Sequence, residues 1–341
     1  MENNRENRFS YKLIWFQFLL SVLVVLIHAG NNAPILLVDN AEVVVFFGNM
    51  FSYVGNIAVP CFFSVSGFLF YQQFKWDKLL GKFKRRVLTL IIPFVIWNSL
   101  IYFAYLGLSQ IRGLHLEEMQ FSVKNYMMAV VNSEYSPLWY IRTLFVYVLL
   151  TPIFVVMQER KWTALLSIGF LLGLGYLGVS IPVVGNYYLP FYLIGAYMAK
   201  YHNDTILLRC KGSARLLAAM GIFVIAVIAA LYIPFGLGAN WLYTLRLLGV
   251  LSAWFALDWF RFENKPGKWM RVSFAIYAMH CVFIKIGKTL AYYYLPHTWW
   301  VLLGEFVLLP GITVAIIVGI NCALSKNRYT QKIWWFMLGN R

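Results

Sequence analysis

The chain has 341 residues, of which 61% are hydrophobic and only 12% are charged, and its mean hydropathy is +0.68. This composition excludes a water-soluble globular protein and is typical of a chain that lies largely in a bilayer. The net charge of +16 would suggest nucleic-acid binding in a soluble protein, but nearly all the cations stand in short segments between apolar runs. The four cysteines, Cys61, Cys210, Cys281 and Cys322, lack metal or disulfide spacing and are interpreted as packing residues.

Apolar runs along the chain predict about ten transmembrane helices in one all-α bundle. The first run is interpreted as a span rather than a signal peptide, because no small-residue cleavage site follows it. The predicted spans cover residues 13–30, 47–73, 87–109, 138–158, 162–180, 186–200, 216–235, 240–260, 272–294 and 299–324. The longest predicted connection is 110–137. We expect one transmembrane domain over residues 1–341, with a basic, aromatic tail at 325–341 that lies on the membrane surface.

The distribution of Lys and Arg predicts the orientation of these spans. Of the 29 cations, 23 fall in the six segments that would be cytoplasmic if both termini were, and two fall in the five opposite connections. Short cytoplasmic segments of membrane proteins carry an excess of Lys and Arg. We therefore expect both termini in the cytoplasm.

Residues 58–97 hold two apolar runs around a basic stretch, which predicts two spans joined by a positively charged cytoplasmic loop. Ser66 and Gly67 stand about 12 Å from that loop at 1.5 Å per residue, and Pro60 predicts a kink further along the same helix. A small, polar, kinked segment beside cations would suit a phosphorylated ligand entering from the cytoplasm. Alternatively, Ser66-Gly67 is a helix-packing notch and the cations only orient the spans.

Seven ionisable residues stand inside the predicted spans, where burial in lipid is costly and usually serves function. They are His28, Arg142, Arg246, His280, Lys285, Lys288 and Glu305. Helix rise places His280 in the inner half of the membrane and His28 in the outer half. Arg142, Arg246 and Glu305 are placed near the outer face, and Lys285 is placed at intermediate depth. Two polar layers of this kind indicate a polar path across the membrane.

Each of these residues also has a structural interpretation. A lone histidine in a helix more often packs than catalyses, Arg142 and Lys288 could snorkel to the interface, and Arg246 and Glu305 could form a structural ion pair. The chain contains no metal-binding His-x-x-x-His on a helix, no nucleotide-binding loop and no Gly-x-Ser-x-Gly. The residues alone therefore leave open a transporter and a membrane enzyme.

Six stretches of the chain resemble a known family. They are LLSVLVVLIHA, AVPCFFSVSGFLF, KRRVLTLIIPFVIW, SPLWYIRTLFVYVLLTP, YYLPFYLIGAYMAK and SFAIYAMHCVFI. Their order and spacing over residues 13–320 are similar to those of the acyltransferase 3 family of bacterial inner-membrane O-acyltransferases. The resemblance implies transfer of an acyl group, usually acetyl from acetyl-CoA, to a sugar of an envelope or exported polysaccharide.

The resemblance also implies which positions form the site. The matching residues are His28, Ser66, Gly67, Phe68, Arg86, Arg142 and His280. Two positions depart from the family's pattern: Gln17 stands where many members have arginine, and Thr89 stands where a second arginine would follow Arg86. These departures bear on CoA binding, and they favour the branch that modifies exopolysaccharide or lipid-linked sugars.

On this interpretation, acetyl-CoA is a co-substrate and no metal takes part. Lys84, Arg85 and Arg86 would hold the CoA phosphates at the cytoplasmic face, and the pantetheine arm would pass Ser66 and Gly67 toward the middle of the membrane. We expect a multi-pass protein of the bacterial inner membrane, with lipid, acyl-CoA and a polysaccharide or sugar-lipid as its partners and no nucleic acid.

His28 is the predicted general base, because the acceptor of an envelope acyltransferase is expected outside and His28 is assigned to the outer half of the membrane. His280 is assigned to donor contact or helix packing. Arg142 or Arg246 would steady the oxyanion. A two-step path through an acyl-histidine remains an alternative.

Two other classes of protein remain open. In a transporter or flippase for a sugar-lipid or small anion, Arg246, Lys285 and Glu305 would line the substrate path together with Arg142. In the enzyme, Arg246, Lys285 and Glu305 would line the path of the acceptor. A structural subunit of an export complex would not need the buried charges. The acceptor sugar and the oligomeric state are not set by the sequence.

Overall fold

Helices account for nearly all of the computed structural model, which describes residues 2–29, 41–110, 121–182, 184–208, 213–232, 239–260, 262 and 264–339 and has no β-strand in these ranges. The α-helices are α1 Glu2–Ala29, α2 Ala41–Gly55, α3 Ala58–Tyr71, α4 Leu79–Arg86, α5 Ile92–Ser109, α6 Val123–Asn132, α7 Trp139–Leu149, α8 Thr151–Met157, α9 Lys161–Tyr176, α10 Leu189–Tyr201, α11 Asn203–Leu207, α12 Ser213–Tyr232, α13 Ala239–Ala256, α14 Ser273–Tyr294, α15 Trp299–Leu324 and α16 Arg328–Met337. The all-α class predicted from composition is confirmed.

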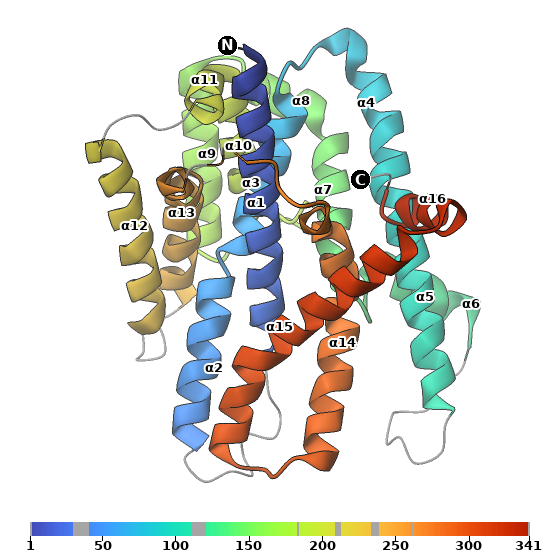
Figure 1. Cartoon of the computed structure of the whole chain (residues 1–341). Helices are drawn as coiled ribbons and strands as arrows, with labels where there is room; N and C mark the ends of the chain where they lie inside the picture. Colours follow the sequence, from blue (N-terminus) through green and yellow to red (C-terminus); the bar gives the residue numbers. More distant parts are fainter. Residues whose placement is uncertain are drawn as a thin grey trace.

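The helices form one bundle around α1 (Figure 1). α14 lies beside α1 and runs in the same direction, and α15 crosses α14 at a steep tilt. α3 packs along α10, and α12 packs along α13. The N-terminus, α4 and α11 lie at one end of the bundle, and the connection between α14 and α15 lies at the other. The first of these ends is the one predicted to face the cytoplasm.

Several helices are long and apolar enough to cross a membrane. By length and composition, the described residues contain four such stretches: Asn7–Ala29, Trp76–Ser109, Ser273–Tyr294 and Trp299–Leu324. A fifth is added if α7 and α8, which meet at an angle of 65°, form one broken span. These helices support a membrane protein. The ten spans and the cytoplasmic termini stay predictions.

The second predicted span, 47–73, is not one helix. It is broken between α2 and α3, at Asn56 and Ile57. Pro60, the third residue of α3, has no N–H with which to bond the carbonyl of Asn56, so a continuous helix would lose a hydrogen bond here. The predicted interruption is therefore present, but as a break one turn before the proline rather than as a kink at it.

The basic stretch predicted to be a loop is also helical. A 3₁₀ turn, α4, a π-helical turn at Val87–Ile91 and α5 follow one another without a break from Trp76 to Ser109. The π turn directly precedes Pro93, whose missing N–H disturbs the regular α-helical bonding at this point. The cations therefore stand on a helix that continues into the bundle. The long predicted connection, 110–137, likewise contains a helix, α6.

The C-terminal tail packs on the bundle through α16. The indole of Trp334 is buried, donates to the side-chain oxygen of Asn321 at 2.8 Å and meets the ring of Trp97 edge-on at 6.1 Å. Trp97 in turn donates to the backbone carbonyl of Met337 at 2.9 Å. These contacts fix the tail against α5 and α15, and they bring Leu338 to the wall of the cavity described below.

Candidate active site

The relative register of α1 and α14 is set by the segment that precedes α14. Phe262 lies against Trp15, with ring centroids 6.3 Å apart, and Trp269 meets Phe18 edge-on at 5.3 Å. This segment therefore follows α1 into the bundle instead of staying at its end. α14 begins beside the middle of α1, where the hydroxyl of Ser21 donates to the carbonyl of Ser273 at 3.4 Å.

This register brings the two predicted histidines together. Seven residues separate Ser21 from His28 on α1, and seven separate Ser273 from His280 on α14. Because the two helices run in the same direction, the histidines reach the same depth, and their rings lie 4.9 Å apart. The prediction of two polar layers, with His28 outside and His280 inside, is wrong: it assumed that α14 begins at the membrane face.

The two imidazoles have different surroundings. His280 is fully buried, and its Nδ1 lies 2.9 Å from the carbonyl oxygens of Ile276 and Tyr277. Carbonyls only accept, so Nδ1 carries the proton and Nε2 of the neutral ring has a free lone pair. That Nε2 lies 3.4 Å from Sγ of Cys281. The side chain of His28 is only half-buried.

A cation and a carboxylate complete this group. The Lys288 ammonium donates to the backbone carbonyl of His28 at 3.0 Å. It interacts electrostatically with the His28 ring, the Cys281 thiol and the Glu305 carboxylate. Of the two interpretations of Lys288 that the sequence leaves open, snorkelling to the interface or a place among buried polar groups, the structure favours the second.

His28, His280 and Cys281 could also hold a metal ion. Their ligand atoms all lie within 4.8 Å of one another, and within the described ranges no other group of three such residues is this close. Nitrogen and sulfur ligands of this kind suit zinc. The Lys288 ammonium beside them opposes the binding of a second cation.

A polar cavity of about 450 Å³ leads from one end of the bundle toward the histidines. Arg86 and Arg271 line one part of it, and Val24 and Tyr277 line another. Ser10 and Val24, both on α1, are separated by fourteen residues, or about 21 Å of helix. His28 follows Val24 by one helical turn, and His280 follows Tyr277 by about one turn. The cavity therefore ends next to the histidine pair.

Hydroxyl groups line the middle of this cavity. Ser66 and Tyr140 share a hydrogen bond of 2.8 Å, and Tyr140 also donates to the carbonyl of Phe62 at 3.2 Å. Tyr277 donates to the carbonyl of Pro137. Its ring lies 5.8 Å from that of Tyr140 and 6.2 Å from that of His280. Tyr277 thus stands between the cavity and the histidines.

The predicted cofactor residues divide into two groups. Arg85 and Arg86 line a recess next to the cavity together with Lys82, whose ammonium donates to the carbonyl of Phe70 at 2.5 Å. Lys84 is exposed and lines neither space.

Gly67 faces away from the cavity, toward α10, where a Cβ on Gly67 would overlap the carbonyl of Tyr192. Ser66 lines the cavity and Gly67 does not. Gly67 is therefore a helix-packing residue, which corrects its assignment to the donor site.

The predicted acceptor path is not gathered in one place. Arg142 donates to the carbonyl of Val131 on α6 at 2.9 Å. Arg246 donates to Tyr187 and Asn56, at 2.5 and 2.7 Å.

The ammonium of Lys285 lies over the ring of Tyr105 at 4.4 Å, and Glu305 interacts with Lys288. Among these groups, Glu305 is the one linked to the histidine cluster through Lys288. The predicted ion pair between Arg246 and Glu305 is absent from the described contacts.

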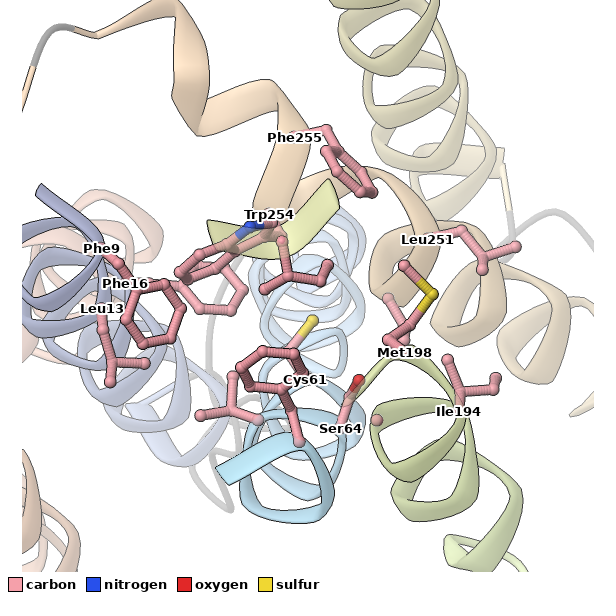
Figure 2. A pocket seen from close by; sticks show the side chains of 15 residues that line it. Phe9, Leu13, Phe16, Cys61, Ser64, Ile194, Met198, Leu251, Trp254 and Phe255 are labelled. Carbon is pink, nitrogen blue, oxygen red and sulfur yellow. The ribbon is translucent and has the colours of Figure 1, made fainter. Parts of the chain in front are cut away.

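A second, apolar cavity lies on the other side of α1 and α3 (Figure 2). Its volume is about 80 Å³. Figure 2 shows Phe16 and Trp254 on one side and Ile194 and Met198 on the other, with Cys61 projecting from α3 between them. None of the described residues that line this cavity is charged.

Three residues of the site, Tyr140, Tyr277 and Cys281, were not predicted, and Lys288 was listed among the ionisable residues of the spans but was not placed beside the histidines. Tyr140 and Tyr277 gave no signal beyond aromatic content. Cys281 follows His280 directly in the sequence, and Lys288 follows it by eight residues, near the same face of one helix. A histidine flanked by a thiol and a lysine in an apolar run was the signal that could have revealed them.

In a comparison with known protein families, the family model described as an acyltransferase domain matches residues 10–322, nearly the whole chain. A search of curated proteins and a search of solved structures found no match.

Proposed function

Because the chain belongs to the acyltransferase 3 family, it is a membrane acyltransferase, and we propose that it transfers an acetyl group from cytoplasmic acetyl-CoA to a sugar hydroxyl. The acceptor would be an envelope or exported polysaccharide, and the enzyme would work in the bacterial inner membrane. The observation that carries this proposal is the polar cavity, which has arginines at one end and the histidine pair beyond the other. A phosphorylated donor with a long, thin reactive arm matches these two ends.

The donor would bind with its phosphates at Lys82, Arg85, Arg86 and Arg271. Guanidinium groups bind phosphate through paired, charge-assisted hydrogen bonds. The pantetheine arm would follow the cavity past Ser66 and bring the thioester to Tyr277. Gln17 stands where many members of the family have an arginine, and it lines the cavity. At this position the donor arm would therefore meet an uncharged amide.

His28 would act as the general base. Its ring is half-buried and its position one turn beyond Val24 adjoins the end of the cavity. It would take the proton of the sugar hydroxyl as the oxygen attacks the thioester carbon, and CoA would leave as the thiol. His280 is less suited to meet the acceptor because it is fully buried.

The oxyanion would be stabilised by Lys288 rather than by Arg142 or Arg246. Both arginines are bonded to other groups, Arg142 to α6 and Arg246 to Asn56 and Tyr187. The Lys288 ammonium interacts directly with the histidine cluster. A fixed cation near the developing negative charge lowers the barrier in a site that excludes water.

The proposal is tested with purified protein in lipid nanodiscs. Acetyl-CoA is added with cell-surface polysaccharide from a deletion strain, and release of the CoA thiol and acetylation of the polysaccharide are measured together. We expect both, in equal amounts. Uptake or flipping of a sugar-lipid with no thioester cleavage would assign the protein to transport instead.

A further inference from the structure

Cys281 and His280 form a thiol–imidazole pair that the general-base mechanism does not use. Sγ of Cys281 lies 3.4 Å from Nε2 of His280. The backbone carbonyls of Ile276 and Tyr277 hold the proton on Nδ1, so Nε2 is free to accept the thiol proton. A nucleophile in contact with a base that a third group orients is the arrangement of enzymes that form covalent acyl intermediates.

The Lys288 ammonium lies next to the thiol and interacts electrostatically with it. Burial disfavours the thiolate, which is the reactive form of cysteine, and the cation offsets only part of this cost. The thiol therefore has to pass its proton to His280 as it attacks. The same cation opposes a divalent metal at His28, His280 and Cys281.

The position of Cys281 fits the path of the donor. Tyr277 lines the polar cavity, and Cys281 follows it by four residues, on the same face of α14. The thiol is half-buried. A thioester that reaches Tyr277 along the cavity is therefore one helical turn from Sγ.

We propose that Cys281 accepts the acyl group from acyl-CoA and passes it to the acceptor, a two-step path that rests on the acyltransferase function proposed above. In the first step the thiol proton moves to Nε2 of His280, Sγ bonds to the acyl carbon, and the bond from that carbon to the CoA sulfur breaks. The CoA thiolate takes the proton from His280 and leaves. No oxidant or further reactant is needed.

In the second step His28 takes the proton of the acceptor hydroxyl, and the hydroxyl oxygen attacks the acyl carbon on Cys281. The carbon–sulfur bond breaks, and the proton returns to the Cys281 sulfur. Because the two histidines lie close together, His280 can serve as the base in the first step and His28 in the second, at the same acyl carbon.

The other described cysteines provide matched controls. Cys61 is buried beside the apolar cavity, and Cys322 is exposed near the end of α15. Within the described part of the chain, neither of them hydrogen-bonds to a histidine, as Cys281 does. Cys281→Ala, Cys322→Ala and Cys61→Ala therefore remove the same group from three different surroundings.

The experiment uses full-length protein in nanodiscs with radiolabelled acetyl-CoA and no acceptor. After acid quenching, we expect label on the peptide that contains Cys281, released by hydroxylamine as a thioester is. The label should be absent in Cys281→Ala and present in Cys322→Ala and Cys61→Ala. In Cys281→Ala, acceptor acetylation should fall on the order of 10²-fold, the scale for one participating group, while CoA binding shows that the variant is folded.

Three results would overturn the covalent path. The first is acceptor acetylation at the wild-type rate by Cys281→Ala. The second is wild-type transfer with no label on Cys281 in rapidly quenched samples. The third is one equivalent of zinc in the wild-type protein that is lost in Cys281→Ala, which would make the thiol a metal ligand. All three leave the acyltransferase function intact, whereas a wild-type protein that cleaves no thioester would end both proposals.

Discussion

The polar cavity and the apolar cavity are both lined by α1 and α3, but they differ in volume and in the charge of their lining residues. α1 turns Ser10 and Gln17 toward the polar cavity and Phe9 and Phe16 toward the apolar one. The polar cavity is larger, about 450 Å³ against about 80 Å³. It also has arginines among its lining residues, which the apolar cavity lacks. The comparison shows that residues one position apart on a helix can line two cavities that differ in polarity.

The polar cavity also differs in what lies beyond its end. Tyr277 leads to His280, Cys281 and, through the ring contact, to His28. The apolar cavity is lined mainly by side chains such as Trp254 and Met198, and none of the described residues that line it is a histidine. If the account is right, substitutions on the polar side change chemistry and donor affinity, and substitutions on the apolar side change stability alone.

The largest effect is expected at the reacting end of the polar cavity. His28→Ala should lower acetyl transfer by roughly 10²-fold or more, because the acceptor hydroxyl loses its general base. The Kd for acetyl-CoA should be unchanged, since the cations that hold the donor lie at the other end. Transfer and isothermal binding are measured on the same preparation. A near-normal rate in His28→Ala, together with loss of transfer in His280→Ala at unchanged CoA binding, would exchange the roles of the two histidines.

A smaller effect is expected at the cationic end. Arg86→Glu should weaken acetyl-CoA binding by about tenfold or more, because a hydrogen bond to a charged group contributes about 1.5–3 kcal/mol. Lys84→Glu makes the same change of charge at an exposed residue that lines neither cavity, and it should change the Kd much less. Both variants are first checked for correct membrane orientation. Equal Kd values for the two variants would show that Arg86 does not bind the donor.

Two serines on α3 allow the same substitution to be tested in each cavity. Ser66 lines the polar cavity and Ser64 the apolar one. Ser66→Leu should raise the KM for acetyl-CoA about tenfold, because the larger side chain would overfill part of the donor path at a cost of about 1.4 kcal/mol. Ser64→Leu should leave that KM unchanged. Steady-state kinetics of the two variants test this prediction. A larger rise of the KM in Ser64→Leu than in Ser66→Leu would place the donor in the apolar cavity.

The smallest effect on transfer is expected from the apolar wall. Trp254 is buried, meets Phe16 edge-on at 5.4 Å and lies under the Lys12 ammonium at 4.1 Å. Trp254→Ala should lower the free energy of unfolding by about 3–5 kcal/mol, and it should leave the KM for acetyl-CoA unchanged. Thermal unfolding in detergent and donor kinetics test the two halves of this prediction.

Apolar runs predicted the positions of most of the long helices, because a helix that lies in a bilayer needs a long apolar stretch. The orientation derived from cation counting stays a prediction. The apolar runs did not predict the helical basic stretch at Trp76–Arg86, which is too polar to be recognised as part of a longer apolar helix. The break at Asn56 was also not located, because the only sequence feature connected with it is Pro60, one helical turn later.

Several residues singled out in the sequence lie close together in the structure: Ser66 and Arg86 line the cavity, and His28 and His280 lie next to its end. Their roles in binding a donor stay predictions. Their relative depth could not be derived from helix rise, because packing of the segment before α14 on Trp15 and Phe18 sets where that helix begins. Such packing is a tertiary property with no periodic signal in the sequence.

The most direct test of the account asks which cavity receives the acyl arm of the donor. An acyl-CoA analogue with a photoreactive group in its acyl chain is bound to the protein in nanodiscs, irradiated, and mapped by peptide mass spectrometry. We predict cross-links at Tyr140, Tyr277 and the peptide that contains Cys281, all suppressed by excess acetyl-CoA. Cross-links confined to Met198 and Phe255 of the apolar cavity would contradict the account.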